Sequence, residues 1–194
     1  SLSSMTDTNV EISYDADWGN SSSHAPFIYD YFSQTLRERE TLSQEFRIVS
    51  DIANFKDNQN KEWVIGISYF EVNEANLKKD DGLYGDPSDP FGPYASNSQF
   101  SSKFSSDNFS VFGNLDYFFD DSLKLSIGAR WENYESEYSD SLGELFRPSD
   151  QMSGGKISIN KNFSADSNIF ISVARGFNQG GFNLNLGLAP DSNN

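Results

Sequence analysis

The stretch Leu123-Lys124-Leu125-Ser126-Ile127-Gly128-Ala129-Arg130-Trp131-Glu132-Asn133 alternates between apolar side chains and polar or small ones. Its apolar set is Leu123, Leu125, Ile127, Ala129 and Trp131. Successive side chains of a β-strand point to opposite faces of the sheet, so a period of two puts each set on one face. The stretch therefore predicts a strand with one apolar face and one polar face.

The same alternation returns in six other stretches of the chain. They are Val10–Asp15, Leu42–Ile48, Trp63–Tyr69, Phe109–Phe119, Ile157–Phe163 and Ile169–Val173. No stretch shows a convincing 3.6-residue apolar period, which a surface helix would have. The sequence therefore predicts an all-β protein of about seven strands.

The connections between these stretches alternate between short and long. The short polar links lie at Phe55–Lys61, near Asp120-Asp121 and at Ser164–Ser167, and the long ones cover residues 18–39, 77–99 and 139–151. This pattern is typical of an antiparallel up-and-down sheet with tight turns at one rim and long loops at the other. Outer-membrane barrels have the same asymmetry, with short periplasmic turns and long extracellular loops.

The composition fits such a wall and excludes several other classes of protein. Aromatic residues make up 15% of the 194 residues and apolar residues only 36%, and the formal net charge is −15. A negative field of this size repels phosphate backbones, so we expect no nucleic-acid partner. The chain has no cysteine, which excludes disulfides and thiolate metal sites. No apolar run reaches the roughly 18 residues of a membrane helix, although barrel strands need none.

Aromatic residues gather near both ends of the predicted strands. The first group is Trp63, Tyr117, Phe118, Phe119 and Phe163, and the second is Tyr69, Phe70, Trp131 and Tyr134. Two aromatic bands are expected where a barrel wall crosses the two membrane interfaces. The alternative is that these rings fill the core of a soluble β-sandwich. Band placement together with loop asymmetry favours the membrane.

Five segments, taken in order, resemble the barrel of TonB-dependent receptors. They are Ser43–Ser50 (SQEFRIVS), Trp63–Phe70 (WVIGISYF), Ser110–Tyr117 (SVFGNLDY), Leu123–Trp131 (LKLSIGARW) and Ala174–Asn183 (ARGFNQGGFN). The first is similar to the family's early strand with its Gln-Glu-aromatic-Arg core. The third and fourth are similar to a hairpin that ends in Gly-x-Arg-aromatic, and the last is similar to an Arg-Gly-Phe strand end.

The resemblance implies a plug domain inside a large barrel in the bacterial outer membrane, energised from the inner membrane through TonB. The implied partners are outer-membrane lipid, the TonB complex acting through the plug, and a small-molecule nutrient such as a ferric siderophore, cobalamin or an oligosaccharide. Barrels that hold a plug use about 22 strands. We therefore expect residues 1–194 to be a partial barrel, with the plug and the C-terminal strands absent from them and no transport by this stretch alone.

The polar faces of the predicted strands carry candidate lumen residues. Glu45 and Arg47 share one polar face, Arg130 and Glu132 share another, and Arg175 precedes a glycine-rich strand end. In the barrel interpretation all five side chains face the lumen, where they bind the plug or line the ligand path. The alternative is solvated charge pairing, which stabilises little at an exposed site.

The second long loop carries Tyr84, Phe91 and Tyr94, which are candidates for stacking on a ligand. Binding residues are often on loops that a rigid scaffold positions. The aspartates of this region are Asp80, Asp81, Asp86 and Asp89. Oxygen-rich loops can bind calcium, but the spacing does not match an EF-hand, so we expect a solvated acidic loop and no metal site.

No catalytic constellation stands out in the chain. His24 is the only histidine, which argues against a histidine zinc site and a Ser-His-Asp triad. We expect no catalytic residue, no metal and no cofactor. Three alternatives to the plugged transporter stay open: a passive porin-like barrel, a soluble β-sandwich module that binds carbohydrate and, last, an extracellular hydrolase.

Overall fold

A computed structural model describes residues 1–20, 22–50, 60–164 and 166–178. These residues form one antiparallel sheet. Its strands are β1 (Leu2–Asp15), β2 (Ile28–Val49), β3 (Lys61–Gly85), β4 (Tyr94–Asp120), β5 (Leu123–Asp140), β6 (Leu145–Phe146), β7 (Ser149–Ser164) and β8 (Ser167–Arg175). The order across the sheet is β1-β2-β3-β4-β5-β7-β8, and the two-residue β6 lies off this path beside β5.

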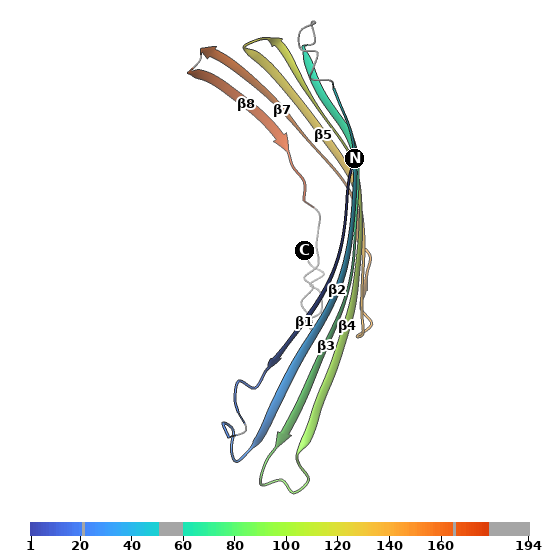
Figure 1. The fold of residues 1–194 in the computed structure, drawn as a ribbon, viewed down its shortest axis with the longest axis vertical. Coiled ribbons are helices and arrows are strands. Elements are labelled where there is room, and N and C mark those ends of the chain that lie inside the picture. The colour runs from blue at the N-terminus through green and yellow to red at the C-terminus, as the bar shows by residue number, and fades with distance from the viewer. Residues whose placement is uncertain (21, 51–59, 165, 179–194) are drawn as a thin grey trace.

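The sheet is an open, curved wall with one concave and one convex surface (Figure 1). In the described residues it does not close on itself, because β1 and β8 lie at opposite ends of the strand order. The up-and-down antiparallel arrangement confirms the predicted fold class. The described part of the chain forms no helix long and apolar enough to cross a membrane.

The strand register places the apolar sets of β2 to β8 on one face. Phe46, Ile67, Val111 and Trp131 form a row across β2–β5, and their exposed fractions run from 39% for Trp131 to 52% for Phe46. The buried residues of the described chain other than glycine all lie on the opposite face: Ser33, Glu74, Asn76, Asp80, Ser102, Ser106, Ser110, Glu132, Tyr134, Ser136, Tyr138, Met152 and Ser158. Side chains crowd together on the inside of a bend, so the polar face is the concave one.

The apolar band on the convex face has the height of a membrane core. On β5 it runs from Leu123 to Trp131, and a transmembrane strand needs about 9–11 residues. Two rows beyond Trp131 the same face carries Glu71, Asp107 and Glu135 side by side. The strands therefore leave the membrane band at this rim and continue into water.

The three long loops predicted from the sequence are much shorter in the structure. Strands β2, β3 and β4 have 22, 25 and 27 residues, so only residues 16–27, 86–93 and 141–148 lie between the long strands at this rim. Outside the membrane both faces meet water, and the strands lose the apolar alternation while their backbone pairing continues. For the same reason Val10 and Ile12 of β1, which pair with Arg37 and Thr35, lie on the concave face.

The opposite rim has the tight turns that the sequence predicts. Strand β5 begins three residues after the end of β4, and the turn is closed by Asp120 Oδ1, which accepts the N–H of Ser122 at 2.7 Å. Strands β7 and β8 are joined just as closely, between Ser164 and Ser167. Most of the third short link, predicted at Phe55–Lys61, lies outside the described residues.

Candidate functional site: the concave face

Two matching rows of side chains cross the concave face inside the membrane band. From β2 to β7, the first row is Arg47, Gly66, Phe112, Arg130 and Gly154. The second row, one step closer to the long-loop rim, is Glu45, Ser68, Ser110, Glu132 and Met152. Each row therefore carries two like charges, one on β2 and one on β5, with uncharged residues between them.

The charges of the two rows pair along their strands. Glu45 forms an ion pair with Arg47 on β2, and Glu132 forms the equivalent ion pair with Arg130 on β5. Glu132 is the more enclosed acid, with 9% of its side chain exposed against 22% for Glu45. The concave face thus carries two similar acid–base pairs. The alternation along each strand predicted the two pairs, but it did not predict that their rows match across the sheet.

An aromatic ring lies between the two arginines. The Cζ atoms of Arg47 and Arg130 are 5.9 and 5.6 Å from the ring centroid of Phe112, within the range of a cation–π contact. The ring covers the backbone of Gly66, where an added Cβ would lie 2.5 Å from a Phe112 ring carbon. The absence of a side chain at position 66 therefore lets Phe112 lie flat between the two cations.

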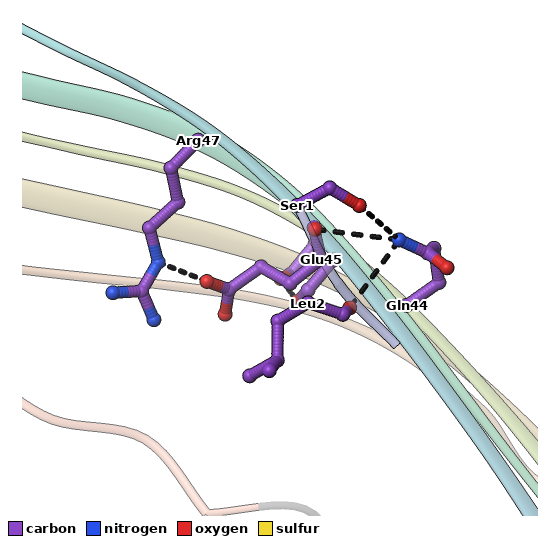
Figure 2. A network of polar contacts seen from close by, with 7 residues as sticks. Ser1, Leu2, Gln44, Glu45 and Arg47 are labelled. Atoms are coloured by element: carbon purple, nitrogen blue, oxygen red, sulfur yellow. Dashed lines mark hydrogen bonds and ion pairs between the residues drawn. The ribbon is translucent and has the colours of Figure 1, made fainter. Parts of the chain in front are cut away.

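The first pair is seen from close by in Figure 2. Glu45 and Arg47 project from one side of the sheet, and Gln44 projects from the other. The Nε2 of Gln44 donates to Ser1 Oγ at 3.0 Å and to the carbonyl of Leu2 at 3.3 Å. The first strand is thereby fixed to β2 at the point where the concave face carries its first charged pair.

Arg175 does not join these pairs. It is opposite Gly155, and two residues along the chain Val173 is opposite Ile157. Because Ile157 belongs to the apolar band, the register puts Arg175 on the convex face, at the end of β8. The register therefore does not place Arg175 with the predicted lumen residues. The alternation of Ile169, Ile171 and Val173 continues to position 175 and already indicated the apolar face.

The three aromatic ligand candidates lie together at the tip of the β3–β4 hairpin, but two of them are strand residues. Tyr84 pairs with Tyr94 at the end of the ladder, and Tyr29 of β2 continues the row on the concave face. The Tyr94 hydroxyl donates to Asp89 at 2.8 Å, while Phe91 in the turn is 84% exposed. The sequence identified this hairpin but missed Tyr29, which lies far away along the chain.

A charged cluster on the concave face, above the membrane band, was also missed. The carboxylate of Glu74, only 2% exposed, accepts the Nε of Arg39 at 2.6 Å and the Nδ2 of Asn76 at 2.7 Å, and lies 3.6 Å from the Nε of Arg37. Burial alone would raise the pKa of Glu74, but the hydrogen bonds from Asn76 and Arg39 and the two positive charges hold it below its usual value.

The aspartates at this rim form hydrogen bonds and ion pairs with neighbouring groups of the protein. Asp80 accepts the Ser33 hydroxyl at 2.6 Å and pairs with Lys78 at 3.0 Å. Burial would raise the pKa of Asp80, but the partners Ser33 and Lys78 lower it. In the turn, Asp89 accepts the N–H of Phe91 at 2.9 Å. The described residues contain no group of acids and histidines that could hold a metal ion.

These features define a class of protein. An antiparallel wall with an apolar outer band, a polar and charged inner face, tight turns at one rim and hairpins that extend into water at the other is the wall of a transmembrane β-barrel. The strand order leaves both edges of the described sheet unpaired. Open edges are not tolerated in lipid, so such a wall works as part of a closed barrel.

Residues 2–194 match the family described as TonB dependent receptor-like, beta-barrel, and the chain belongs to this family. Its place is therefore the bacterial outer membrane, and the family consists of receptors and transporters rather than enzymes. No curated protein sequence matches the chain.

Two solved structures show the same fold. The ferric yersiniabactin uptake receptor FyuA from Yersinia pestis is 15% identical, with a TM-score of 0.54 over 96% of this chain and 30% of the receptor. The copper transporter OprC is 14% identical, with a TM-score of 0.57 over 89% of this chain and 26% of the transporter. The chain thus spans less than a third of the length of either protein.

Proposed function

We propose that the chain forms part of the barrel wall of an outer-membrane transporter that imports a scarce nutrient and takes its energy through TonB. The observation that carries this proposal is the match of residues 2–194 to a TonB-dependent barrel together with a charged concave face. The candidate nutrients are ferric siderophores, cobalamin and oligosaccharides. FyuA is named for the uptake of a ferric siderophore, which supports the first of these candidates, whereas OprC is named for copper, which is not among them.

Uptake by cells tests this proposal against a passive porin. The gene that encodes the chain is deleted, and uptake of labelled ferric siderophores, cobalamin and oligosaccharides is compared with that of the parent strain and of a strain without TonB. We expect the uptake of one ligand class to be lost in both deletion strains. Uptake that needs the gene but not TonB would identify a passive channel instead.

We further propose that the Glu45–Arg47 and Arg130–Glu132 pairs bind the plug. Both pairs lie on the concave face at the height of the apolar band, and both arginines contact the Phe112 ring, so the four charges form one connected surface. A plug domain inside the barrel would bring its own charged side chains to these residues. Ion pairs between wall and plug would then replace the ion pairs within the wall. Buried acids and bases that lose their partners destabilise strongly, which would fix the plug in one orientation.

Conductance of the complete protein in planar bilayers tests the plug contact. Replacing Glu45 and Glu132 by glutamine should loosen the plug and raise ion conductance. The matched control replaces Glu71 and Glu135, on the convex face of β3 and β5, by glutamine. Equal conductance in the two double variants would contradict a plug contact at Glu45 and Glu132.

We also propose that the hairpin tip captures the ligand before it reaches the lumen. Tyr29, Tyr84 and Tyr94 are each about half exposed and lie in one row on the concave face, with Phe91 beside them in the turn. Replacing Tyr84 and Tyr94 by alanine should weaken ligand binding by about tenfold, as is usual for aromatic contact residues. Unchanged affinity would show that the hairpin tip does not contribute to ligand binding.

A further inference from the structure

Beyond the apolar band the wall is taller on one side of β4 than on the other. We call the space on the concave side of this aqueous part of the wall the vestibule. Strand β4 pairs with β3 as far as Tyr94, whereas its ladder with β5 ends where Ser102 pairs with Asp140. Figure 1 shows that the β3–β4 hairpin extends well beyond the β5–β7 turn. Residues 94–101 of β4 therefore have β3 on one side and no strand of the described chain on the other. We call this side of residues 94–101 the open edge.

The pairing of Ser101 shows which backbone groups face the open edge. Its carbonyl accepts the N–H of Ser141 at 2.9 Å and its N–H donates to the Ser141 hydroxyl at 3.1 Å, so both groups point away from β3. The backbone groups of a paired strand point to its two neighbours at alternate residues. The N–H and C=O groups of Ala95, Asn97 and Gln99 therefore point to the open edge, and in the described chain none of them has a backbone partner.

The sequence of the open edge does not protect it from pairing. Residues 94–102 read YASNSQFSS, without a charge or a proline, and residues 94–99 are all exposed. Open edges of natural sheets usually carry lysines, prolines or bulges that prevent another strand from adding. The hairpin does carry four consecutive charges, at residues 78–81 (KKDD), but these lie on β3, which is paired on both sides. The exposed strand is therefore the one suited to accept a further strand.

A hollow lies on the convex face at the end of the open edge nearest the apolar band. Its volume is about 540 Å³, and the apolar part of its lining comes from Leu36, Ala75 and Leu77. Leu36, Leu77 and Ser101 form one row across β2–β4. A strand added beside β4 would have a residue opposite Gln99 whose side chain points to the same face. Diagonal positions of neighbouring strands are about 7–8 Å apart, which an aromatic or long apolar side chain spans. Such a side chain would fill the hollow.

The position of the open edge favours a partner from outside the barrel. The edge lies beyond the apolar band at the rim of the long hairpins, which is the extracellular rim of an outer-membrane barrel. On this side of β4 the order continues with β5, β7 and β8, so β7 and β8 lie about 10 and 14 Å away. A segment of the same barrel would have to cross the ends of these strands to reach the open edge, whereas a second protein reaches it directly.

We propose that the open edge of β4 binds an extended segment of a second protein at the cell surface, which adds to the sheet as a further strand. Main-chain hydrogen bonds to Ala95, Asn97 and Gln99 supply the affinity, and one large apolar side chain in the hollow supplies the specificity. The partner is distinct from the imported nutrient, so the proposal does not depend on transport.

Binding of a synthetic peptide to the complete purified protein in detergent tests the open edge. The probe is a short peptide that alternates threonine and valine, with phenylalanine at its central position. The matched control peptide has the same side chains but N-methyl groups on its backbone amides, so it cannot donate along either edge. We expect the probe to bind and the N-methylated peptide to bind at least about tenfold more weakly. No binding of the probe, or equal binding of the two peptides, would overturn the proposal.

Two variants of Gln99 separate strand addition from binding to the hollow alone. Gln99→Pro removes an N–H that points to the open edge and has no backbone partner in the described chain. It should weaken probe binding about fivefold with an unchanged melting temperature. Gln99→Thr keeps the N–H and should bind as the parent does. Equal binding by Gln99→Pro and the parent would contradict strand addition. A probe with threonine in place of phenylalanine should bind the parent more weakly, and equal binding of that probe would contradict the role of the hollow.

Cross-linking in living cells distinguishes a second protein from a segment of the barrel itself. A photoreactive phenylalanine analogue replaces Asn97 in the complete protein, and the control replaces Asn73, on the convex face of β3. We expect a cross-link to a second polypeptide from position 97 that is lost when Gln99→Pro is added, and none from position 73. Cross-links only within the same chain, or none from position 97, would show that no second protein adds to the open edge.

Discussion

At the scale of single residues, the arrangement of the concave face depends on a glycine, which leaves room for an aromatic ring. Gly66 is opposite Arg47 on one side and Phe112 on the other, and the Phe112 ring covers it between two arginines. An aromatic ring placed over a glycine shields the exposed backbone of a sheet. The rigid row of cation, ring and cation exists because position 66 leaves room for the ring.

Gly66→Ala should therefore destabilise the barrel. The added Cβ would lie 2.5 Å from a Phe112 ring carbon and 2.9 Å from the carbonyl oxygen of Phe46, so the ring must move away from both arginines. Overpacking of this kind costs about 1–3 kcal/mol. The measurement is the temperature at which the folded barrel loses its distinct gel mobility. The control is Gly113→Ala, whose nearest atom is 3.4 Å away and which should have little effect.

Acid should loosen the vestibule cluster around Glu74. The pKa of Glu74 is lowered in the folded protein, so its charged form stabilises the fold above the usual value of about 4.3. This stabilisation disappears as the pH falls through the lowered folded pKa. Glu74→Gln should lower stability by about 1–3 kcal/mol at neutral pH, because two arginines lose their acceptor. The loss on acidification should then be smaller in the variant than in the parent, measured by thermal unfolding between pH 3 and 7.

The residues of the inner face could be predicted from the sequence only in part. Alternation along one strand places Glu45 with Arg47 and Arg130 with Glu132, because each pair is local. The meeting of Arg37 and Arg39 with Glu74, and of Tyr29 with Tyr84, depends on the register between strands, which no local pattern contains. Arg175 is a different case, since its chemistry suggested a lumen residue while the alternation of its strand indicated the apolar face.

At the scale of elements, the hairpin of β3 and β4 combines a membrane part and an aqueous part. Near the short turn, Trp63, Ile65 and Ile67 face outward in one apolar row along β3. Beyond Tyr69 the outward positions become Glu71 and Asn73, while the ladder to β4 continues without interruption as far as Tyr84 and Tyr94. One regular hairpin therefore crosses the membrane and builds the vestibule.

Hydrogen exchange should detect this continuity. The backbone amides of residues 71–84 pair with residues 94–107, so we expect slow exchange along most of both stretches in the complete protein. Flexible loops would instead exchange within seconds, because their amides are bonded to water. Fast exchange from Leu77 to Gln99 would support the long loop predicted there from the sequence and contradict the extended hairpin.

Ile127→Arg should block insertion of the complete protein into the outer membrane. Ile127 lies in the middle of the apolar band between Leu115 and Ile157 and is 40% exposed on the convex face. An arginine at the membrane midplane costs about 2–4 kcal/mol. The control is Ser126→Arg, which points into the lumen beside Asp116 and should assemble normally. Normal assembly of Ile127→Arg, measured by membrane fractionation, would count against a lipid-facing band.

Strand boundaries explain where prediction from sequence stops. The apolar band is visible in the sequence because lipid on one side and water on the other enforce alternation, as from Leu123 to Trp131. Once both faces are in water, serine, asparagine and lysine can occupy either face, and stretches such as residues 94–107 resemble a loop. The tight turns remain visible because their geometry selects short polar links.

At the scale of the whole molecule, the chain is a curved sheet with two unpaired edges. In the described residues β1 and β8 each have one neighbour, and FyuA and OprC, which have a similar fold, are more than three times as long. Closure by further strands would satisfy both edges and enclose the concave face, with its charged pairs at membrane height and its arginines above them. The central claim is that the convex face contacts lipid and the concave face is enclosed. All the other assignments depend on it.

The most direct test of that claim is a scan of spin labels along residues 123–140 of the complete protein in lipid. Single labels are introduced through cysteines, which the chain itself lacks. Accessibility is then measured to oxygen, which dissolves in lipid, and to a water-soluble nickel chelate. We expect the odd positions from Leu123 to Trp131 to be accessible to oxygen and protected from nickel, and positions beyond Asn133 to meet nickel on their outer face. Odd positions protected from both reagents, as in the core of a soluble sandwich, would contradict the barrel wall.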